Sequence, residues 1–497
     1  MTAVPGVAAV AAVNPLPAVN TPQAIDESRY DVVGIGLGPF NLSLAALAEP
    51  LRENHGLRAL FLDDKPEFSW HPGMMIDGAR LQVPFLADLV SLTDPTSRYS
   101  VLNWLRDTDR LYSFYFAEDL FLERREYEAY CRWVANQLPS CRFGSAVTEV
   151  WLDGDEFEVC HTAANGSSSS VRAANVVLGI GTEPSIPAGL RDIDACHSSD
   201  YLSNCERLRD LPDVTVVGSG QSGAEVVLDL LRNGCDGQRV RWLTRTAAFE
   251  PMEYSKLGLE HFTPDYTRYF HGLTADARTA LLNVQGRLHR AISTETITEL
   301  HSELHARTFG GDTGVTLMPD TAVVGGSQAA DGALVLDCSQ ARQSMDFRVR
   351  TAGLVLATGY RHRAPRFLAP ISGLLRRDDR GRLDVALDHR VPIRGSGAGL
   401  YVQNAEIHTH GVGAPDLGLG AHRAAVILNA LTGREVYRLP TRAAHTSFDV
   451  RVAADSDPGI LLPGQEFPRP RASAPASAPI RIEEAADAPD VVTHSTV

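Results

Sequence analysis

Cysteine is scarce in this sequence and is never paired. The 497 residues contain seven scattered cysteines, none in a C-x-x-C pair: Cys131, Cys141, Cys160, Cys196, Cys205, Cys235 and Cys338. Neither a zinc site nor a disulfide framework is indicated, and the redox dithiol of a flavin disulfide reductase is lacking. A reducing compartment fits this usage best, which predicts a cytoplasmic location.

The sequence also lacks a membrane segment and an excess of basic charge. Residues 1–27 are rich in Ala, Val and Pro, but they have no basic start, and prolines such as Pro5 and Pro15 break their apolar run. They resemble neither a signal peptide nor a membrane span, and we expect a disordered leader. The formal net charge of −15 argues against nucleic acid and anionic membrane as partners, because both require a basic surface.

The first recognisable unit, residues 30–47, is a predicted strand, a glycine loop and the start of a helix. An apolar run leads into Gly34, Gly36 and Gly38, and a helix is predicted to open near Pro39. Glycine lets the backbone approach a pyrophosphate, and the N–H groups at a helix start favour its negative charge. The unit therefore predicts a dinucleotide site, although Pro39 stands where G-x-G-x-x-G has its third glycine.

An acidic pair ends the next predicted strand. The run LRALFLDDK places Asp63 and Asp64 one βαβ unit after Gly34. In a dinucleotide fold, an acid at this position accepts hydrogen bonds from the ribose hydroxyls. The pair therefore strengthens the prediction of a first dinucleotide site.

A second and complete G-x-G-x-x-G follows the predicted strand 214–217. It consists of Gly218, Gly220 and Gly223, and the strand after it ends at Arg245, where an NAD site would carry an acid. Because an arginine there can hold a 2′-phosphate, NADP is favoured over NAD. The alternative is that Arg245 is an ordinary solvated surface charge.

Spacing and alternation predict several further elements. We expect a helix over 125–137, hairpin strands in 143–163 that lead to a buried strand ending near 178, and two helices within 273–307. A buried strand at 354–357 precedes Thr358, Gly359 and Tyr360. A last strand at 400–403 precedes a loop with His408 and His410 and a helix from about Leu417.

Several long motifs resemble one family. They are G-x-G-P-x-N-L-S-L-A from Gly36, WHPGM from Trp70, Gln82 with FLADLVSLTDPTSRYSVLNWL, ATGY ending at Tyr360, and N-A-x-x-H-T-H-G ending at Gly411. These runs are similar to those of the N-hydroxylating flavin monooxygenases, the microbial lysine, ornithine and diamine N-hydroxylases of hydroxamate siderophore biosynthesis. This resemblance makes Pro39 part of the first loop's signature.

The resemblance implies an α/β fold with two Rossmann-like dinucleotide-binding domains. The FAD domain is discontinuous, with parts at 28–205 and 346–440, and the NADPH domain is inserted at 206–345 with a substrate-lining segment at about 249–310. Residues 441–497, rich in Pro, Ala and Ser, read as a disordered tail. The family also implies a homo-oligomer, either a dimer or a tetramer.

The implied cofactors are FAD and NADPH, with dioxygen and a small amine as substrates and no metal. By this resemblance, NADPH would reduce FAD, the reduced flavin would capture dioxygen as a C4a-hydroperoxide, and the distal oxygen would pass to the neutral amine. Gln82, Trp70 and Gln221 are the candidate catalytic residues, which position flavin and NADP⁺. The predicted cofactor-binding residues are Gly34, Gly36, Gly38, Pro39, Asp63, Asp64, Trp70, His71, Met74, Gln82, Gly218, Gly220, Gln221, Ser222, Gly223, Arg245, Thr358, Gly359, Tyr360, His410 and Leu417.

Two departures from the family pattern bear on the substrate. Ornithine hydroxylases carry FLKDL, whose lysine holds the substrate carboxylate, where this sequence has Ala87, and they carry an asparagine at the position of Leu259. Since a buried carboxylate without a cation is costly, we expect a diamine such as cadaverine or putrescine. The distal ammonium would then be held by Glu253, Glu260 or Asp88.

Two alternatives remain open. Lys256 or an arginine could replace the lost contacts in an L-lysine N6-hydroxylase, and an L-ornithine N5-hydroxylase is less favoured. A different class is a flavin-binding protein that does not hydroxylate, or a reductase.

Overall fold

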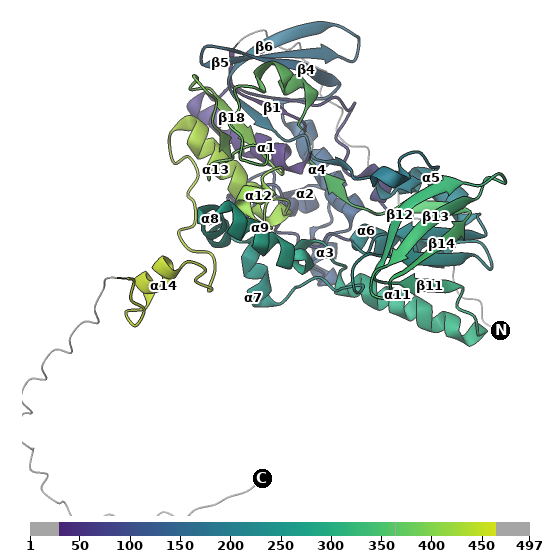
Figure 1. Cartoon of the computed structure of the whole chain (residues 1–497). Coiled ribbons are helices and arrows are strands. Elements are labelled where there is room, and N and C mark those ends of the chain that lie inside the picture. Colours follow the sequence, from purple (N-terminus) through teal and green to yellow (C-terminus); the bar gives the residue numbers. More distant parts are fainter. Residues whose placement is uncertain (1–28, 363, 464–497) are drawn as a thin grey trace, which may run out of the picture. The chain divides into compact units, whose positions relative to one another are not determined.

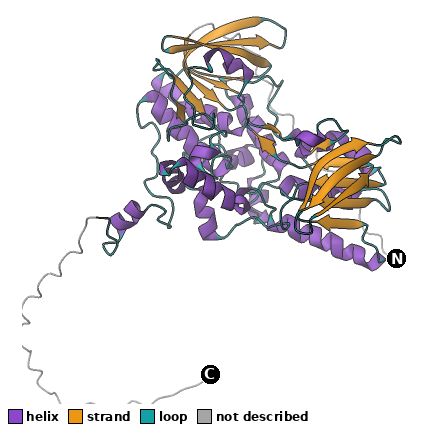
Figure 2. Cartoon of the chain, in the orientation of Figure 1, coloured by secondary structure: helices purple, strands orange, loops and turns teal. Residues whose placement is uncertain are grey.

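The structure is a computed structural model that describes residues 29–362 and 364–463 (Figure 1). The predicted leader and the last part of the predicted tail lie outside the described residues. Among the described residues, those up to Thr446 form one compact unit, and those from Ser447 form a second. Within the first unit, Figure 2 shows two clusters of strands with helices between them.

The first sheet carries the first glycine loop. Its strand order is β17-β18-β6-β1-β2-β3, with β1, β2, β3, β6 and β18 parallel, and β4 and β5 join it as an antiparallel hairpin on β6. The strands are β1 (Arg29–Ile35), β2 (Ala59–Leu62), β3 (Cys141–Arg142), β4 (Ser145–Asp153), β5 (Glu156–Ala163), β6 (Ser168–Leu178), β17 (Arg390–Val391) and β18 (Gly399–Val402).

Helix α1 (Pro39–His55) follows β1 and is almost entirely buried. Pro39 occupies its first turn, where the missing N–H of proline costs nothing, and Gly56 ends it with φ 69°. It packs against α13 (Gly420–Thr432) and α4 (Arg124–Gln137), and α4 confirms the helix predicted at 125–137. Two short helices, α2 (Val101–Asp107) and α3 (Leu111–Ala117), precede α4.

The second sheet carries the second glycine loop and is wholly parallel, in the order β11-β10-β9-β15-β8. Helices α5 (Tyr201–Arg209), α6 (Gln221–Asn233) and α11 (Thr294–Arg307) accompany it, and α6 packs against both of the others. The strands are β8 (Cys196–His197), β9 (Asp213–Val217), β10 (Arg239–Leu243), β11 (Val315–Met318) and β15 (Gly353–Leu356). Two Rossmann-like parallel sheets confirm the predicted fold class.

Two predicted domain boundaries are wrong. The strand expected at 354–357 is β15, and it pairs with β9 and β8 in the second sheet, not the first. Strand β8 belongs to the same sheet, so the chain enters the second domain before residue 205 and leaves it after Leu356. A buried apolar strand followed by a glycine turn has the same sequence pattern in either sheet. Only the strand pairing shows to which sheet such a strand belongs.

Smaller elements complete the first unit. The strands β12 (Thr321–Gln328), β13 (Leu334–Gln340) and β14 (Met345–Thr351) form an antiparallel sheet, and β7 (Glu183–Pro184) pairs with β16 (Tyr360–Arg361). The expected substrate-lining segment holds the short helices α7 (Lys256–Leu259), η4 (Glu260–Phe262), α8 (Pro264–Gly272), α9 (Ala275–Val284) and α10 (Gly286–His289). The predicted pair of helices in 273–307 is therefore interrupted by the single turn α10.

Near the C-terminus, α12 (Ile407–His410) follows β18, and η7 (Leu417–Leu419) leads into α13. The helix predicted from Leu417 thus begins as one 3-10 turn. In the second unit, α14 (Val450–Ser456) is a helix within the segment that was predicted to be disordered.

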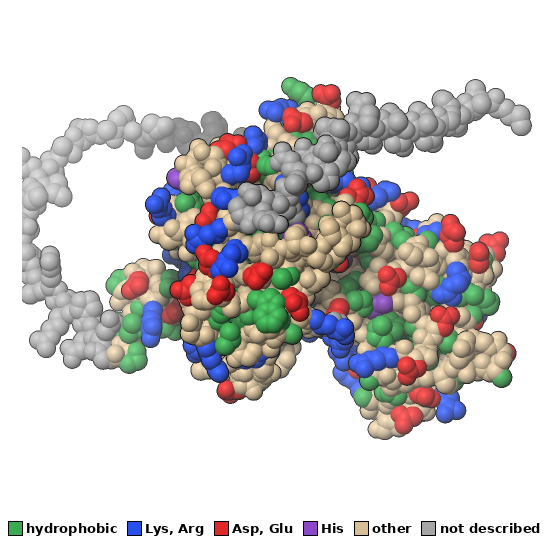
Figure 3. Space-filling model, turned by 90° about the horizontal axis from the view of Figure 1, so that it is seen from above, with side chains coloured by type: hydrophobic (Ala, Val, Ile, Leu, Met, Phe, Trp, Pro, Cys, Tyr) green, Lys and Arg blue, Asp and Glu red, His purple; other side chains and the backbone are tan. Residues whose placement is uncertain are grey.

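Among the described residues, no helix is long and apolar enough to cross a membrane. On the face drawn in Figure 3, the described acidic and basic side chains are interspersed.

Candidate functional site

The first glycine loop leaves open space at the start of α1. A Cβ added to Gly36 (φ +85°) would lie 2.7 Å from the carbonyl oxygen of Gly179, so glycine is required there. At Gly38 no described atom lies within 4 Å of an added Cβ, and no side chain caps the helix that begins after it. Uncapped N–H groups beside open space suit a pyrophosphate.

Asn41 holds this loop in place from beneath. Its side chain is fully buried, and its amide nitrogen donates to the carbonyl oxygen of Gly36 at 2.7 Å. Its amide oxygen accepts a hydrogen bond from Gln403 Nε2 at 2.6 Å. Because Gly36 follows β1 and Gln403 follows β18, one amide joins the ends of two strands.

Asp63 has a partly different role from the one predicted. It is buried, and its Oδ2 accepts hydrogen bonds from the backbone N–H of Leu37 at 2.6 Å and from Lys65 Nζ at 3.0 Å. The carboxylate therefore ties the glycine loop to the end of β2. Asp64 beside it is exposed, and the ribose contact remains a prediction for this pair.

An aromatic wall follows β2. Trp70 and His71 meet edge to face with ring centroids 4.8 Å apart, and His71 lies 6.1 Å from the ring of Tyr360. The structure thus brings together two motifs that are far apart in sequence, WHPGM and ATGY. Next to Tyr360, Gly359 (φ +79°) faces open space, and the Thr358 hydroxyl donates to the carbonyl oxygen of Ser185 at 2.6 Å.

Gln82 and Met74, both predicted to contact the flavin, differ in the surroundings of their side chains. The Gln82 amide nitrogen is buried and has no hydrogen-bond partner among the described residues. Since a buried donor without a partner is costly, it fits a position that faces a cofactor. Met74 is only 3% exposed and packs in the core of the second domain, so the prediction of a flavin contact for its side chain is not supported.

The second glycine loop follows β9. Gly218 (φ +119°) and Gly223 both lie against backbone, with added Cβ atoms 2.1 Å from Ala357 O and 2.2 Å from Gly218 O. Gly220 is more open and precedes α6, which no side chain caps. These are the tight turn, close packing and free helix start that a dinucleotide loop needs. Ser222 lies half-buried in the first turn of α6.

Arg245 lies at the end of β10 and is exposed, and within the described residues no hydrogen bond or ion pair engages its guanidinium. A free cation at this edge of the sheet suits the 2′-phosphate of NADPH. This role remains a prediction.

The Gln221 amide is hydrogen-bonded within the protein, and its role in positioning the cofactors remains a prediction. Its amide oxygen accepts from the backbone N–H of Ser293 at 2.8 Å, and its amide nitrogen donates to Glu225 at 2.8 Å and to Thr296 at 2.9 Å. Glu225 also receives two hydrogen bonds from Arg124, at 2.7 and 2.6 Å. Since Arg124 begins α4 and Glu225 lies on α6, this bidentate ion pair joins the two nucleotide-binding domains.

Asp88 is not available for a substrate ammonium. It is 3% exposed, and its carboxylate accepts hydrogen bonds from the N–H groups of Val90 (2.9 Å), Ser91 (2.6 Å) and Val101 (2.8 Å). The Ser91 hydroxyl adds another at 2.7 Å. Because these bonds use its acceptor sites, Asp88 fixes the loop that carries Ala87.

Ala87 and Leu259 are the two positions that depart from the ornithine pattern. Ala87 is buried, and its Cβ would lie 3.9 Å from a Cβ added to Gly418. Leu259 ends α7 and is half-buried, whereas Lys256 at the start of that helix is exposed. Glu253 is half-buried and accepts from the N–H of Ser255 at 2.7 Å.

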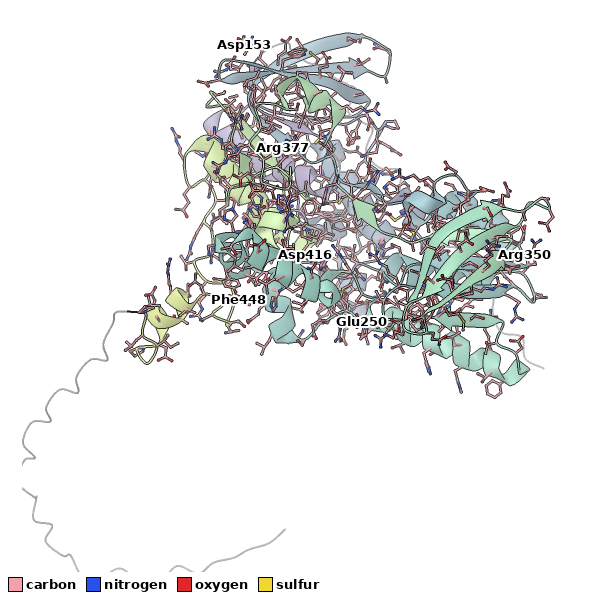
Figure 4. The ribbon with its side chains drawn as sticks, viewed as in Figure 1. Asp153, Glu250, Arg350, Arg377, Asp416 and Phe448 are labelled. Carbon is pink, nitrogen blue, oxygen red and sulfur yellow. The ribbon has the colours of Figure 1, made fainter. Side chains whose placement is uncertain are left out.

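Asp416 is a candidate that the sequence analysis missed. Its Oδ1 accepts a hydrogen bond from the N–H of Gly418 at 2.7 Å, which places it beside Ala87. Burial raises its pKa to about 6. Burial, with the charges of Glu295 and Asp416, also raises the pKa of Tyr254. Figure 4 shows Asp416 among the helices between the two strand clusters.

His410 belongs to a buried cluster next to a cavity of about 440 Å³. Its ring stacks on His389 with centroids 4.2 Å apart, and Arg423 Nε lies 3.3 Å from Glu406. Burial raises the pKa of Glu406, but Arg423 and His389 outweigh it and hold that pKa well below the ordinary value. In the part of the chain that the structure describes, no group of three or more His, Cys, Asp or Glu residues has the arrangement of a metal site.

Glu260 anchors a C-terminal strap, residues 441–446. Its carboxylate accepts hydrogen bonds from the N–H groups of His445 at 3.0 Å and Thr446 at 2.8 Å, and from the Thr446 hydroxyl. Asp265 accepts from the N–H groups of Ala443 at 2.6 Å and Ala444 at 3.0 Å. The strap is therefore ordered, contrary to the prediction for 441–497. These bonds lower the pKa of Glu260 to about 2, and they commit its carboxylate to the strap.

We predict that Glu260→Gln loosens the strap without unfolding the enzyme. The variant loses the charge that strengthens the hydrogen bonds to His445 and Thr446, so trypsin should cut faster at Arg442 within the strap. Limited proteolysis followed by mass spectrometry checks this. Glu253→Gln is the matched control, because Glu253 makes no contact with the strap, and equal cleavage rates in both variants would contradict the assignment.

Comparison with known proteins agrees with this geometry. The family described as L-lysine 6-monooxygenase/L-ornithine 5-monooxygenase matches residues 28–362. A putrescine N-hydroxylase of Shewanella oneidensis is 40% identical over 430 residues, which cover 85% of each chain.

Two solved structures are similar along most of their length. The FAD-bound cadaverine monooxygenase of the desferrioxamine pathway of Erwinia amylovora has a TM-score of 0.82 and 40% identity, over 84% of this chain and 98% of that one. An ornithine N-hydroxylase from Kutzneria, solved with reduced FAD, NADP⁺ and L-ornithine, has a TM-score of 0.77 and 27% identity, over 82% and 99%. The resemblance predicted from the motifs is confirmed: this chain belongs to the L-lysine 6-monooxygenase/L-ornithine 5-monooxygenase family of N-hydroxylating flavin enzymes.

Proposed function

We propose that this protein is an FAD- and NADPH-dependent N-hydroxylase of an aliphatic diamine, cadaverine or putrescine, in cytoplasmic hydroxamate siderophore biosynthesis. The observation on which the substrate assignment rests is the replacement of carboxylate-binding groups by Ala87 and Leu259, with the half-buried acid Asp416 beside Ala87. Relatives that act on putrescine and on cadaverine are each 40% identical to this chain.

The residues present fit both cofactors. The open space at Gly38 and the uncapped start of α1 suit the FAD pyrophosphate, and the unpartnered amide of Gln82 suits the flavin. The start of α6 after Gly220, with the exposed Arg245, suits NADPH. When bound, these cofactors supply the reducing equivalents and the activated oxygen for hydroxylation.

The protein itself must bind the diamine and keep its reacting end neutral. An aliphatic amine has an ordinary pKa of about 10.4, and only its neutral form is nucleophilic. Burial of the reacting amine disfavours its charged form. At the other end of the diamine, Asp416 pairs with the ammonium, since Asp88 and Glu260 are engaged within the protein.

The L-lysine alternative receives less support. A lysine substrate brings a carboxylate that needs a cation or several donors. Lys256 is exposed at the start of α7, and a cation in that position gains little from pairing in water. A diamine brings no carboxylate and needs no such partner.

The direct test is hydroxylamine formation with NADPH from cadaverine, putrescine, L-lysine and L-ornithine. We expect kcat/KM for a diamine to exceed that for either amino acid on the order of 100-fold, because an unpaired buried carboxylate costs about 3 kcal/mol. Product from the amino acids alone would refute the substrate assignment. FAD binding without substrate-stimulated NADPH oxidation would refute hydroxylation altogether.

Gly38→Ala should fold but bind FAD poorly. The added methyl group meets no protein atom within 4 Å, so it occupies the space assigned to the pyrophosphate. We expect the Kd for FAD to rise at least about tenfold, with little change in Tm of the apoprotein. Gly373→Ala, which also adds a methyl group to open space, should retain FAD, and flavin absorbance after desalting measures both.

Asp416→Asn should weaken binding of the diamine and remove one pH dependence. Asparagine can still accept the hydrogen bond from Gly418, but it has no charge for the ammonium. In the wild type, the Asp416 pKa of about 6 means that the carboxylate gains a proton below pH 6, so KM for the diamine should rise there. In Asp416→Asn, KM should be high at pH 7.5 and lack this step, whereas identical pH profiles would remove Asp416 from the site.

A further inference from the structure

The turn that follows the aromatic wall passes from the first domain into the second. Trp70 packs against the hydrophobic core of the first domain, whereas Met74, four residues later, is buried in the core of the second. Between them lies η1 (Pro72–Met74), where a Cβ added to Gly73 would lie 1.8 Å from the carbonyl oxygen of Ser199, just after β8. Since no side chain fits there, the backbones of the two segments are in direct contact. The WHPGM motif therefore docks one domain on the other.

Arg124, the first residue of α4, lies at this junction. Its backbone N–H donates to the carbonyl oxygen of Ala79 at 2.9 Å, and its Nη1 donates to the carbonyl oxygen of Met74 at 3.2 Å. The same guanidinium forms the bidentate pair with Glu225 on α6, at 2.7 and 2.6 Å. One side chain of the first domain thus holds both the WHPGM turn and the helix that follows the second glycine loop.

This ion pair is shielded from water and has a fixed geometry. The side chains of Arg124 and Glu225 are 14% and 6% exposed. Two parallel N–H···O bonds fix both a distance and an orientation, and salt screens a buried pair much less than a surface pair. A buried ion pair is often no better for stability than well-packed apolar side chains, but apolar side chains cannot reproduce its directional bonds. Its distinctive contribution is therefore geometry rather than stability.

Glu225 in turn holds the start of α6. Gln221, the first residue of that helix, donates its amide to Glu225 Oε1 at 2.8 Å and accepts from the N–H of Ser293. Gly220, the residue before it, leaves the helix start uncapped, as a pyrophosphate requires. Arg124, Glu225 and Gln221 therefore form one continuous chain of hydrogen bonds from the WHPGM turn to the proposed NADPH loop.

The two cofactor sites depend on such a joint for their separation. Each glycine loop follows a strand of a different sheet, β1 in the first and β9 in the second. Hydride transfer requires reacting atoms about 3–3.5 Å apart, and a misplacement of about 1 Å can cost about 100-fold in rate. A contact that fixes α6 relative to the aromatic wall therefore bears directly on reduction of the flavin.

We propose that Arg124 is a positioning residue for the reduction of the flavin by NADPH. It acts through the Met74 carbonyl and Glu225, and it holds the start of α6 at a fixed place relative to the wall formed by Trp70 and His71. The proposal rests on the proposed NADPH site at α6 but not on the choice of amine, so it is independent of the diamine assignment.

The experiment compares FAD-loaded wild type with Arg124→Gln, Arg124→Lys and Glu225→Gln, without amine and without oxygen. In stopped-flow mixing with NADPH, we expect the limiting rate constant of flavin reduction to fall at least about tenfold in each variant. Lysine keeps the charge but not the two parallel bonds, so Arg124→Lys should be slow at a nearly unchanged Tm. Arg124→Gln/Glu225→Gln should be no slower than the slower single variant, because both changes break the same joint.

A second readout involves no turnover. NADP⁺ added to the oxidised wild type should shift the flavin absorption spectrum, because it changes the surroundings of the flavin, and this shift should be smaller in the variants. The matched control is Arg125→Gln. Arg125 is the next residue of α4, but its side chain is 53% exposed and pairs with Asp77 and Glu123. This control should leave both readouts unchanged.

If Arg124→Gln and Arg124→Lys are reduced at the rate of the wild type, whatever their Tm, the proposal is overturned by itself. Losses that add in the double variant would also overturn it. A wild type that NADPH does not reduce would overturn the proposed function as well. If Arg124→Gln fails to fold or to retain FAD, Arg124→Lys decides, and a wild-type rate in that variant is the refuting result.

Discussion

The architecture depends on the buried amide of Asn41. It accepts a hydrogen bond from Gln403 and donates to Gly36, and its carbon and nitrogen atoms fill the place that a side chain at Gly179 would need. The ends of β1, β6 and β18 therefore converge on one side chain. An unpaired buried amide is costly, so the ends of these three strands are held in one arrangement. That arrangement positions the glycine loop and so defines the open space at Gly38.

The second domain has a glycine loop of the same kind, and an ion pair joins this domain to the first. Arg124 and Glu225 form a bidentate ion pair between α4 and α6, and Gln221 extends it to Ser293. Removing one partner of such a pair leaves a charge largely buried, which typically costs 3–5 kcal/mol. The start of α6, where NADPH is proposed to bind, is thus coupled to the helix that follows the aromatic wall.

The sequence predicted this frame well because glycine loops, strands and long motifs are local patterns. It located both glycine loops and α4. It did not reveal contacts between distant segments: the strand 353–356 pairs with β9 in the second sheet, and the Gln221 amide is hydrogen-bonded to Ser293 and Thr296. Such pairings arise from tertiary contacts that residue type and spacing do not encode.

The acidic residues show the same limit and lead to the substrate. Sequence offered Asp88, Glu253 and Glu260 as equal candidates, but hydrogen bonds commit Asp88 to its own loop and Glu260 to the strap. Asp416 was overlooked because it reads as a helix-capping residue, and it does cap η7. Burial distinguishes Asp416, because it raises the pKa of this carboxyl to about 6. Pairing with a substrate ammonium stabilises such a carboxylate more than it stabilises a fully solvated one. Recognition of a diamine can therefore rest on one acid that structure, not spacing, brings next to Ala87.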